Sequence, residues 1–275
     1  MTTPDSYPLV DIALSRRLER AEGVSSARFV EAMARVAPNI KAEWLEVNST
    51  YALFAGLDSP ITQTFGFGMF ATPTRADLDA IEAFFRERQA PSLHEVSPLA
   101  DPAALTLLNA GGYEPFEFTS MLFRPIGRDL RLGRPLNPRV IARPIRDDER
   151  DLWVETSATG WSETPGIDAM FRTLGPIIAT WEGARAFIAE LDGQPIAAGT
   201  VILSEGVALL AGASTIPAAR NQGAQLALLD ARLRYAAEHG CDLASMGALP
   251  GSGSQRNAER HGFRIAYTRI KWQLR

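Results

Sequence analysis

Cysteine, lysine and export or membrane segments are scarce or absent in this chain of 275 residues. The single cysteine, Cys241, excludes an internal disulfide and fits a reducing cytoplasm. No apolar run is long enough to cross a membrane, and the N-terminus lacks the pattern of an export signal, so we expect a cytoplasmic protein without a membrane partner. Lysine occurs only at Lys41 and Lys271, and the net charge is −4. No basic stripe with interleaved aromatic residues is present, which argues against a nucleic-acid partner.

Several motifs of enzyme chemistry are also missing. The chain has no Gly-x-x-x-x-Gly-Lys-Ser/Thr string, no Gly-x-Ser-x-Gly elbow and no cluster of His, Cys or Asp with metal-ligand spacing. We therefore expect no metal cofactor. The Gly-rich stretch GALPGSGSQRN (247–257) lacks the spacing of a dinucleotide site, and we interpret it as a turn before a helix capped by Ser254.

The chain divides near its middle into two parts with a similar order of elements. Residues 126–138 are rich in Gly, Pro and Arg and show neither helical nor strand periodicity, which predicts a linker between domains 1–125 and 139–275. Gly112 and Gly262 each follow a short helix and precede a strand, at an offset of 150 residues. This correspondence predicts two copies of one α/β unit.

Hydrophobic periodicity predicts a mixed α/β sheet flanked by helices. In the first part we expect a helix at 74–89, a strand at 93–97, a short helix at 101–111 and a strand at 116–124. In the second part the expected order is strand 139–145, helices 146–160 and 168–181, a hairpin over 186–203 turning at Asp192-Gly193, strand 207–215, a helix from Arg220, strand 242–246, helix 254–262 and strand 264–274.

The start of the helix at Arg220 is unusual because it has neither a typical N-cap side chain such as Ser or Asp nor an acidic residue in its first turn. Its first residues include Gly223, and no acidic residue occurs before Asp230. Free backbone N–H groups and the helix dipole favour an anion at such a position, commonly a phosphate. The alternative is a helix start that is simply solvated.

The stretch Arg220-Asn221-Gln222-Gly223-Ala224-Gln225 resembles the acetyl-CoA-binding motif of the GNAT N-acetyltransferase superfamily. That motif is Arg or Gln, two residues, Gly, one residue, then Gly or Ala. The stretch SQRNAERHGFRIAYTR resembles the second motif of the family, a short helix closed by Gly-Phe. The resemblance covers residues 139–275, with the family's order of elements.

The resemblance implies two tandem GNAT-like domains, each with a mixed central sheet flanked by helices. It implies that acetyl-CoA is the co-substrate, and that an acetyl group passes to an amine acceptor, either a small molecule or a peptide. Backbone N–H groups at the helix start would hold the pyrophosphate, and the end of the preceding strand would pair with the pantetheine arm. The implied cofactor-binding residues are Ala213, Ser214, Thr215, Arg220, Asn221, Gln222, Gly223, Ala224, Gln225, Ser254 and Asn257.

The sequence departs from the family pattern at two positions. Gln225 stands where the family has Gly or Ala, so its side chain must lie along the ligand or turn away. Ala258 stands where many members have a tyrosine that acts as general acid. Tyr267 is the nearest replacement, and Ser254 or solvent are the other sources of a proton.

A general base is equally hard to assign. The strand 207–215 has no carboxylate, so Glu163 in the loop WSETPG is the first candidate and Asp168 and Glu190 are weaker ones. Solvated surface carboxylates are the simpler interpretation of all three. We assign no residue to catalysis, and the three histidines receive no catalytic role.

The corresponding helix of the first part provides an internal comparison. Thr74 and Asp77 match a capping box, and Asp77 and Asp79 would repel a phosphate there. Gly66 and Gly68 lie in a stretch that we interpret as strand. The first part is thus predicted to be a degenerate copy. A non-catalytic acyl-CoA-binding or ligand-sensing protein on the same fold is the alternative for the whole chain, favoured by the missing tyrosine.

Overall fold

The computed structural model describes residues 7–164, 166–178 and 180–274, with only the backbone described for residues 167–169 and 174. The chain forms two compact units. Unit 1 contains residues 1–123 and 247–275, and unit 2 contains residues 124–246. Along the described parts, no helix combines the length and the apolarity that a membrane span requires.

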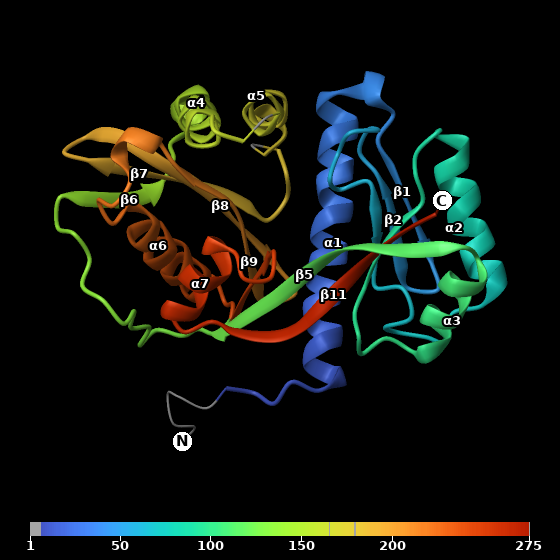
Figure 1. Ribbon diagram of the computed structural model, residues 1–275. Helices are drawn as coiled ribbons and strands as arrows, with labels where there is room; N and C mark the ends of the chain where they lie inside the picture. The colour runs from blue at the N-terminus through green and yellow to red at the C-terminus, as the bar shows by residue number, and fades with distance from the viewer. Residues whose placement is uncertain (1–6, 165, 179, 275) are drawn as a thin grey trace. The chain divides into compact units, whose positions relative to one another are not determined.

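Unit 1 is a mixed sheet between helices (Figure 1). Its strands lie in the order β1-β2-β3-β4-β11-β5, and the long helix α1 packs on the face opposite α2 and α3. The bounds are α1 Ile12–Val36, β1 Glu43–Val47, β2 Thr50–Phe54, β3 Gln63–Phe65, α2 Arg75–Glu87, β4 Leu93–Val96, α3 Pro102–Ala110, β5 Tyr113–Pro125 and β11 Arg264–Leu274. The 3-10 helix η1 Pro38–Ile40 follows α1, and helix α7 Gly253–Arg260 precedes β11.

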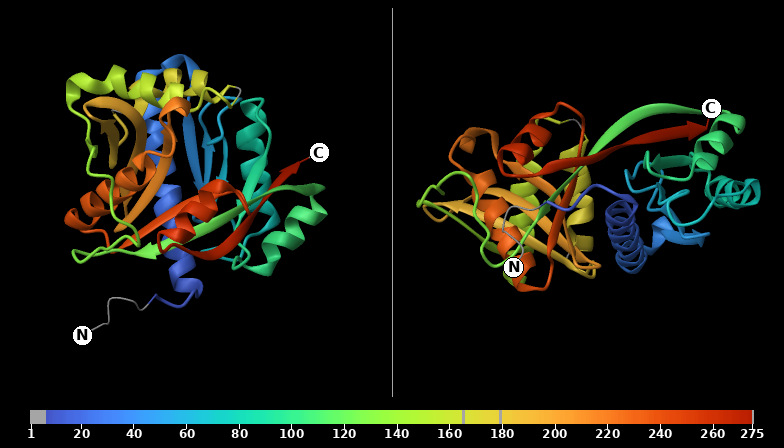
Figure 2. Two further views of the ribbon diagram at one scale, coloured as in Figure 1. Left: turned by 60° about the vertical axis from the view of Figure 1, so that its left-hand side comes forward. Right: turned by 90° about the horizontal axis from the view of Figure 1, so that it is seen from below.

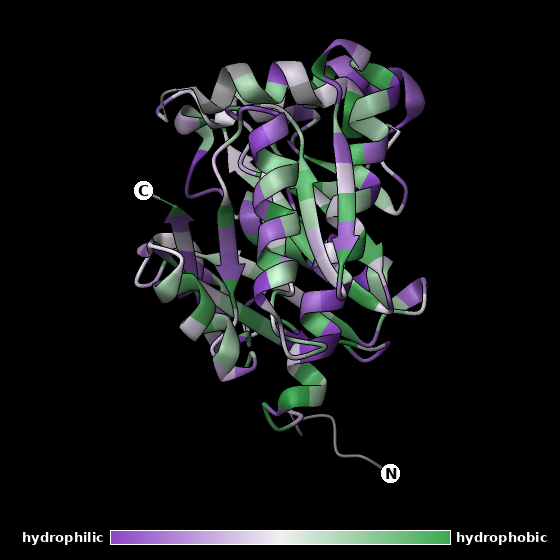
Figure 3. Ribbon diagram, turned by 90° about the vertical axis from the view of Figure 1, so that its right-hand side faces the viewer, coloured by the Kyte–Doolittle hydropathy of each residue, from purple (hydrophilic) through white to green (hydrophobic). Residues whose placement is uncertain are grey.

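The core of unit 1 follows from the alternation of side chains along its strands. Ala52 and Phe54 of β2 face the same apolar cluster as Leu78 and Phe85 of α2, and Trp272 of β11 completes it. On the other face, α1 begins where the Asp11 carboxylate accepts a hydrogen bond from the backbone N–H at position 14, an N-cap of the usual kind. In Figure 3 the helices alternate between hydrophilic and hydrophobic residues, as amphipathic helices do.

The last strand of the chain belongs to unit 1. Strand β11 pairs antiparallel with β5 over most of its length and with β4 at its end, and Figure 2 shows β5 and β11 as one long pair. The compact units divide the chain after residues 123 and 246, and the domain bounds 1–125 and 139–275 stay a prediction. Strand β11 falls in unit 1 because it forms its hydrogen-bonded ladders with strands of the N-terminal part.

Unit 2 has the strand order β10-β9-β8-β7-β6. Helices α4 and α5 pack on one face of this sheet and α6 on the other (Figure 1). The bounds are β6 Val140–Pro144, η2 Asp147–Glu149, α4 Arg150–Gly160, α5 Ile167–Ile178, β7 Ala184–Leu191, β8 Gln194–Ser204, β9 Val207–Thr215, η3 Pro217–Ala219, α6 Ala224–Glu238 and β10 Leu243–Ala248. Residues 126–139 form neither helix nor strand.

Most predicted elements are found close to their predicted places, and the predicted fold class of a mixed sheet flanked by helices is confirmed. The hairpin turns at Asp192-Gly193, where both residues have positive φ. The offset of 150 residues relates β4 to β10, α3 to α7 and β5 to β11, so the element order repeats as predicted.

Three local expectations are wrong. The stretch containing Gly66 and Gly68 is a turn after β3, because both glycines adopt a left-handed φ, +82° and +76°. Helix α7 is capped by Ser252, whose hydroxyl accepts from the backbone N–H of residue 255, and Ser254 lies inside the first turn. Helix α6 begins at Ala224, four residues later than predicted.

Candidate functional site

The candidate site is the connection from β9 to α6 in unit 2. After η3 the chain passes through Asn221, with φ +64°, and Gly223, with φ +86°, before α6 begins at Ala224. Gly223 is the N-cap residue and provides no side chain to close the helix, and the first turn has no acidic residue. Residues 221–223 are exposed, so this helix start is open to a ligand.

The backbone N–H groups of residues 221–226 have no acceptor within the described chain. The first hydrogen bond of the helix is from the N–H of Ala227 to the carbonyl of Gly223. Helix starts leave such donors unsatisfied unless a side chain, water or a ligand supplies an acceptor, and the helix dipole makes an anion favourable. The arrangement therefore fits the pyrophosphate of a nucleotide-containing ligand such as CoA.

The predicted linker, residues 126–138, contacts the loop that precedes α6 through Asn137. The side-chain amide of Asn137 donates a hydrogen bond of 2.8 Å to the carbonyl of Gln222. A Cβ atom at Gly223 would lie 3.4 Å from the Cβ of Asn137. The segment just before β6 thus holds the loop whose N–H groups would bind the anion.

Gln225, the first departure from the family pattern, turns its side chain back toward the preceding strand. Its Nε2 donates a hydrogen bond of 2.8 Å to the hydroxyl of Thr215 at the end of β9. The side chain therefore joins the start of α6 to the end of β9. The backbone N–H of Gln225 stays without an acceptor in the described chain.

Strand β9 has an irregular and partly unpaired end. Between the pairs Ala198–Ser214 and Thr200–Ala211, β9 carries one residue more than β8, which is a β-bulge with Gly212 at φ +61°. The parallel ladder between β9 and β10 covers only residues 207–209 of β9. Its later residues thus present an open backbone edge within unit 2, to which an extended ligand could add as a further strand.

The three predicted residues on β9 differ in which groups they present. Ser214 is buried and its hydroxyl donates to the carbonyl of Ser157 on α4, so only its backbone is available to a ligand. Ala213 and Thr215 are partly buried. The predicted role of the strand end depends on backbone atoms and is compatible with all three side chains.

A buried arginine under α6 was not anticipated from the sequence. Arg232 is 4% exposed and donates to the carbonyls of Leu228 and Thr200, with no carboxylate partner in the described chain. Burial lowers the pKa of Arg232 to about 10, which still leaves the group cationic at neutral pH. The guanidinium lies beside Gly199 of β8, where a Cβ atom would lie 3.0 Å from Nη1 of Arg232 and 3.4 Å from the Cβ of Ala213. An arginine in a helical apolar pattern gives no sequence signal for such burial.

Glu163, the first candidate base, forms an ion pair with Arg220. The distance between Arg220 Nη1 and Glu163 Oε2 is 2.7 Å, and both side chains are about half exposed. The structure thus brings the loop after α4 to the predicted phosphate-binding motif. A carboxylate at this position would compete with a ligand phosphate for the guanidinium.

The weaker candidates give no support for a base. Glu190 pairs with Arg143 at 2.7 Å, and the same arginine holds Glu149. The hydrogen bonds from Arg143 lower the pKa of Glu149 to about 2, as expected for a structural ion-pair network. The side chain of Asp168 lies outside the described residues.

Tyr267 is enclosed in unit 1. It is 5% exposed, and its hydroxyl donates a hydrogen bond of 2.8 Å to Glu19 of α1. Burial raises the pKa of Tyr267 well above its usual value, and the charge of Glu19 raises it further. A tyrosine with this environment is a packing residue and not an accessible general acid. Cys241 is buried as well, which agrees with a structural thiol.

Ser254 and Asn257 lie on α7 of unit 1, both outside the core. All other predicted cofactor residues lie in unit 2. The proposed contact of Ser254 and Asn257 with the ligand stays a prediction. Ala258, at the position where the resemblance implies a tyrosine, is buried on the same helix.

Helix α2 of unit 1 shows how a closed helix start looks in the same chain. Thr74 accepts from the N–H of Asp77, and the Asp77 carboxylate accepts from the N–H of Thr74. Partial burial raises the pKa of Asp77, but hydrogen bonds from Thr74 and Asn48 more than offset this and leave it below the usual value. The predicted capping box is confirmed, so protein groups fill this helix start.

No group of three or more His, Cys, Asp or Glu side chains in the described chain could hold a metal ion. His94, for example, is buried between Thr64 and Ser92, and its burial lowers its pKa to about 3.

Comparison with known proteins identifies the fold. A family model described as an acetyltransferase (GNAT) domain matches residues 130–256, which include the whole connection from β9 to α6. A search of curated proteins finds no match.

Solved structures extend the similarity to both units. A GCN5-related N-acetyltransferase from Kribbella flavida is 17% identical, with TM-score 0.65, over 92% of this chain and 95% of that one. A GCN5-related N-acetyltransferase from Sphaerobacter thermophilus is 14% identical, with TM-score 0.56, over 84% and 75%. A tandem GNAT protein from the clavulanic acid biosynthesis pathway is 14% identical, with TM-score 0.54, over 82% and 77%. At these identities the likeness shows the fold alone, and the chain has a GNAT acetyltransferase fold.

Proposed function

We propose that this chain is a cytoplasmic GNAT-type N-acetyltransferase, which binds acetyl-CoA at the start of α6 and transfers the acetyl group to a small-molecule or peptide amine. The observation that carries the proposal is the uncapped and acid-free helix start with its free N–H groups from residue 221 to residue 226. The match of a GNAT domain to the same segment supports it. The single, buried cysteine agrees with a reducing compartment.

The proposed cofactor contacts follow from the residues of unit 2. The N–H groups of residues 221–225 and the guanidinium of Arg220 would hold the pyrophosphate. The open edge of Ala213 to Thr215 would pair with the pantetheine arm, and Ser254 and Asn257 complete the predicted set. Acetyl-CoA supplies an activated thioester, and the protein supplies position and backbone donors near the β9 bulge.

Transfer is proposed to occur by direct attack in a ternary complex. A neutral amine attacks the thioester carbonyl and the carbon–sulfur bond breaks. The nitrogen loses one proton and the sulfur takes up one, directly or through solvent, so that CoA leaves as the thiol. Cys241 and Tyr267 are buried in packing roles, so no enzyme thiol or tyrosine is assigned to the reaction. Unit 1, with its capped helix α2, is proposed to be a degenerate copy that binds no cofactor of its own.

The proposal is tested by incubating the chain with acetyl-CoA and a panel of amines while a thiol reagent traps the released CoA. Amine-dependent release of thiol, with acetylated amine as product, supports the transferase. Tight binding of CoA without turnover of any amine would instead support the non-catalytic binding or sensing protein, which the replacement of the family's tyrosine by Ala258 also favours.

The ion pair between Glu163 and Arg220 gives a prediction about binding and turnover together. Glu163→Gln should tighten CoA binding about two- to fivefold, because exposed ion pairs of this kind contribute up to about 1 kcal/mol and the guanidinium becomes free for phosphate. In the unsubstituted chain, a phosphate that pairs with Arg220 would displace the Glu163 carboxylate. If that carboxylate then accepts the proton of the amine, Glu163→Gln should lower kcat. Calorimetry and initial rates measure the two effects.

Glu155→Gln is the matched control, since Glu155 is 61% exposed like Glu163 and forms its ion pair with Arg172 between helices α4 and α5, without contact to Arg220. It should change neither quantity. Weaker binding of CoA to Glu163→Gln would contradict the competition between Glu163 and phosphate.

A further inference from the structure

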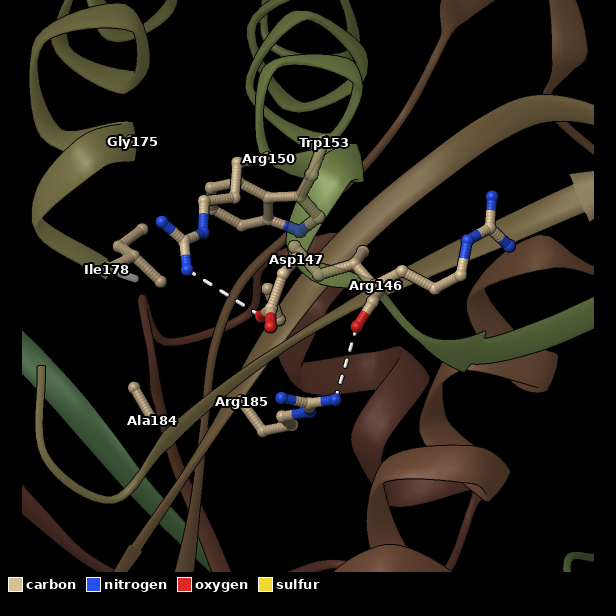
Figure 4. A pocket seen from close by; sticks show the side chains of 10 residues that line it. Arg146, Asp147, Arg150, Trp153, Gly175, Ile178, Ala184 and Arg185 are labelled. Carbon is tan, nitrogen blue, oxygen red and sulfur yellow. Dashed lines mark hydrogen bonds and ion pairs between the residues drawn. The ribbon is translucent and has the colours of Figure 1, made fainter. Parts of the chain in front are cut away.

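Unit 2 contains a pocket that the proposed transfer reaction does not use (Figure 4). It lies where β6 ends and α4 begins, and is closed by the end of α5 and the start of β7. The lining residues that could contact a ligand through a charge or a large apolar side chain include Asp147, Arg150, Trp153, Ile178 and Arg185.

The strand register places this pocket away from the start of α6. Ala184 pairs with Ile202, which pairs with Leu209 of β9, whereas the predicted pantetheine edge reaches Thr215. Ala186, at the other end of this part of the lining, pairs with Thr200, which pairs with Ala211, two residues before that edge begins at Ala213. At about 3.3 Å per residue, the separation along the strand ranges from roughly 7 Å to roughly 20 Å. The lining residues of β7 thus align with positions of β9 that precede the predicted pantetheine edge, and none of them aligns with the edge itself.

Arg185 is the unusual residue of this pocket. Its side chain is partly buried at the start of β7, and its one hydrogen bond in the described chain is from Nη2 to the carbonyl of Ile145, at 3.2 Å. Its Nε is buried and has no acceptor there, and no carboxylate of the described chain pairs with the guanidinium. A partly buried cation without a counter-ion is costly, and an anionic ligand would relieve that cost.

A second guanidinium lies on the same pocket. Arg150, from the first turn of α4, has only a loose contact with Asp147 at 3.6 Å, and both side chains are well exposed. Figure 4 shows Arg146 extending away from Arg150 and Arg185, in agreement with its ion pair to Glu149. In the described chain, the pocket thus has two guanidinium groups without a close carboxylate partner, Arg150 and Arg185, and one carboxylate, Asp147.

The remaining wall is apolar. The indole of Trp153 is almost fully buried and its ring stands beside the pocket, with Ile178 opposite (Figure 4). Ile145, Ala184 and Ala186 continue this surface. An inorganic anion would contact the arginines but would leave this apolar wall uncovered.

We propose that this pocket is a second ligand site, which binds a small organic carboxylate with an apolar body. The carboxylate accepts hydrogen bonds from Arg185 and Arg150, since the planar guanidinium matches a carboxylate in geometry. The apolar body packs against Trp153 and Ile178. Such a ligand binds independently of acetyl-CoA, so this inference does not depend on the proposed transferase reaction.

The test is a titration of the full chain with benzoate, with benzamide as the neutral analogue and inorganic phosphate as the anion without an apolar body. The amide resonances of the nitrogen-15-labelled chain report weak binding and show whether residues near the pocket respond. Benzoate should bind, and benzamide and phosphate should bind about tenfold more weakly or not at all, because each lacks one of the two recognised features.

Arg185→Leu should weaken benzoate binding by about tenfold or more, and Arg150→Gln, at an exposed position that folding tolerates, should weaken it several-fold. Arg139→Gln, which removes an exposed arginine paired with Asp192, is the matched control and should change nothing. Absence of benzoate binding, equal binding of phosphate, or full binding by Arg150→Gln and a folded Arg185→Leu would overturn the proposal.

Discussion

Replacing Arg269 by methionine is expected to destabilise unit 1 by about 3–5 kcal/mol, the usual cost of removing one partner from a buried ionic cluster. Arg269 of β11 is fully buried, and its Nε donates to Glu19 of α1 at 2.8 Å. Its Nη2 lies 2.7 Å from Glu22, and its Nη1 lies 3.8 Å from Glu95 of β4. Methionine fills much of the volume but leaves these carboxylates without their cation.

The cluster also joins the two ends of the chain, because Glu19 and Arg269 are 250 residues apart. Denaturant unfolding of both forms measures the loss. Lys271→Met is the matched control on the same strand, since its ion pair with Glu117 is partly exposed and should contribute about 1 kcal/mol or less. Equal losses for the two variants would show that the buried cluster has no special role.

A neutral substitution at Glu19 should be better tolerated than the loss of Arg269. Burial raises the pKa of Glu19, and the charge and hydrogen bond of Arg269 oppose this without cancelling it. The carboxyl is therefore less costly to replace by an amide, which keeps an oxygen acceptor for Tyr267 and Arg269. Glu19→Gln should cost clearly less than Arg269→Met in the same unfolding measurement.

Gly223→Asp is expected to weaken acetyl-CoA binding by about 2–4 kcal/mol, which is about 30- to 700-fold. The residue is the exposed N-cap of α6, with free N–H groups on either side. An aspartate there would accept those N–H groups itself and would repel the pyrophosphate. Calorimetric titration with acetyl-CoA measures the effect.

Strain at this position must be separated from charge, because Gly223 has φ +86°. Gly223→Asn is the matched control, since asparagine tolerates a left-handed conformation and has nearly the same size without the charge. It should bind acetyl-CoA more tightly than Gly223→Asp. Unchanged affinity in a folded Gly223→Asp would show that the phosphate does not lie at this helix start.

The sequence predicted those features that depend on neighbouring residues. The capping box of Thr74 and Asp77, the turn at Asp192-Gly193 and the uncapped start of α6 are each determined within a few residues, so local pattern was sufficient. The repeat of elements at an offset of 150 residues was predictable for the same reason, because the residues that begin and end each helix and strand occur in both halves of the chain.

Long-range features of the fold could not be read in this way. Nothing local to Arg269 indicates Glu19 as its partner, and nothing local to β11 indicates that it pairs with β4 and β5. The burial of Arg232 and the lack of a counter-ion at Arg185 depend on what packs around each side chain.

The candidate site shows the same limit. The sequence identified the motif from Arg220 to Gln225, and the structure adds how its side chains are engaged: Arg220 by Glu163, and Gln225 by Thr215. The sequence pattern placed the start of the helix at Arg220, but α6 begins at Ala224. Asn221 and Gly223 adopt left-handed backbone angles, which exclude them from the helix and which the sequence pattern does not show.

The most direct measurement is a calorimetric titration of the full chain with acetyl-CoA. The open helix start of α6 and the capped start of α2 predict one site per chain, which Gly223→Asp abolishes or strongly weakens. Two equivalent sites, no binding, or one site that Gly223→Asp leaves intact would contradict the account.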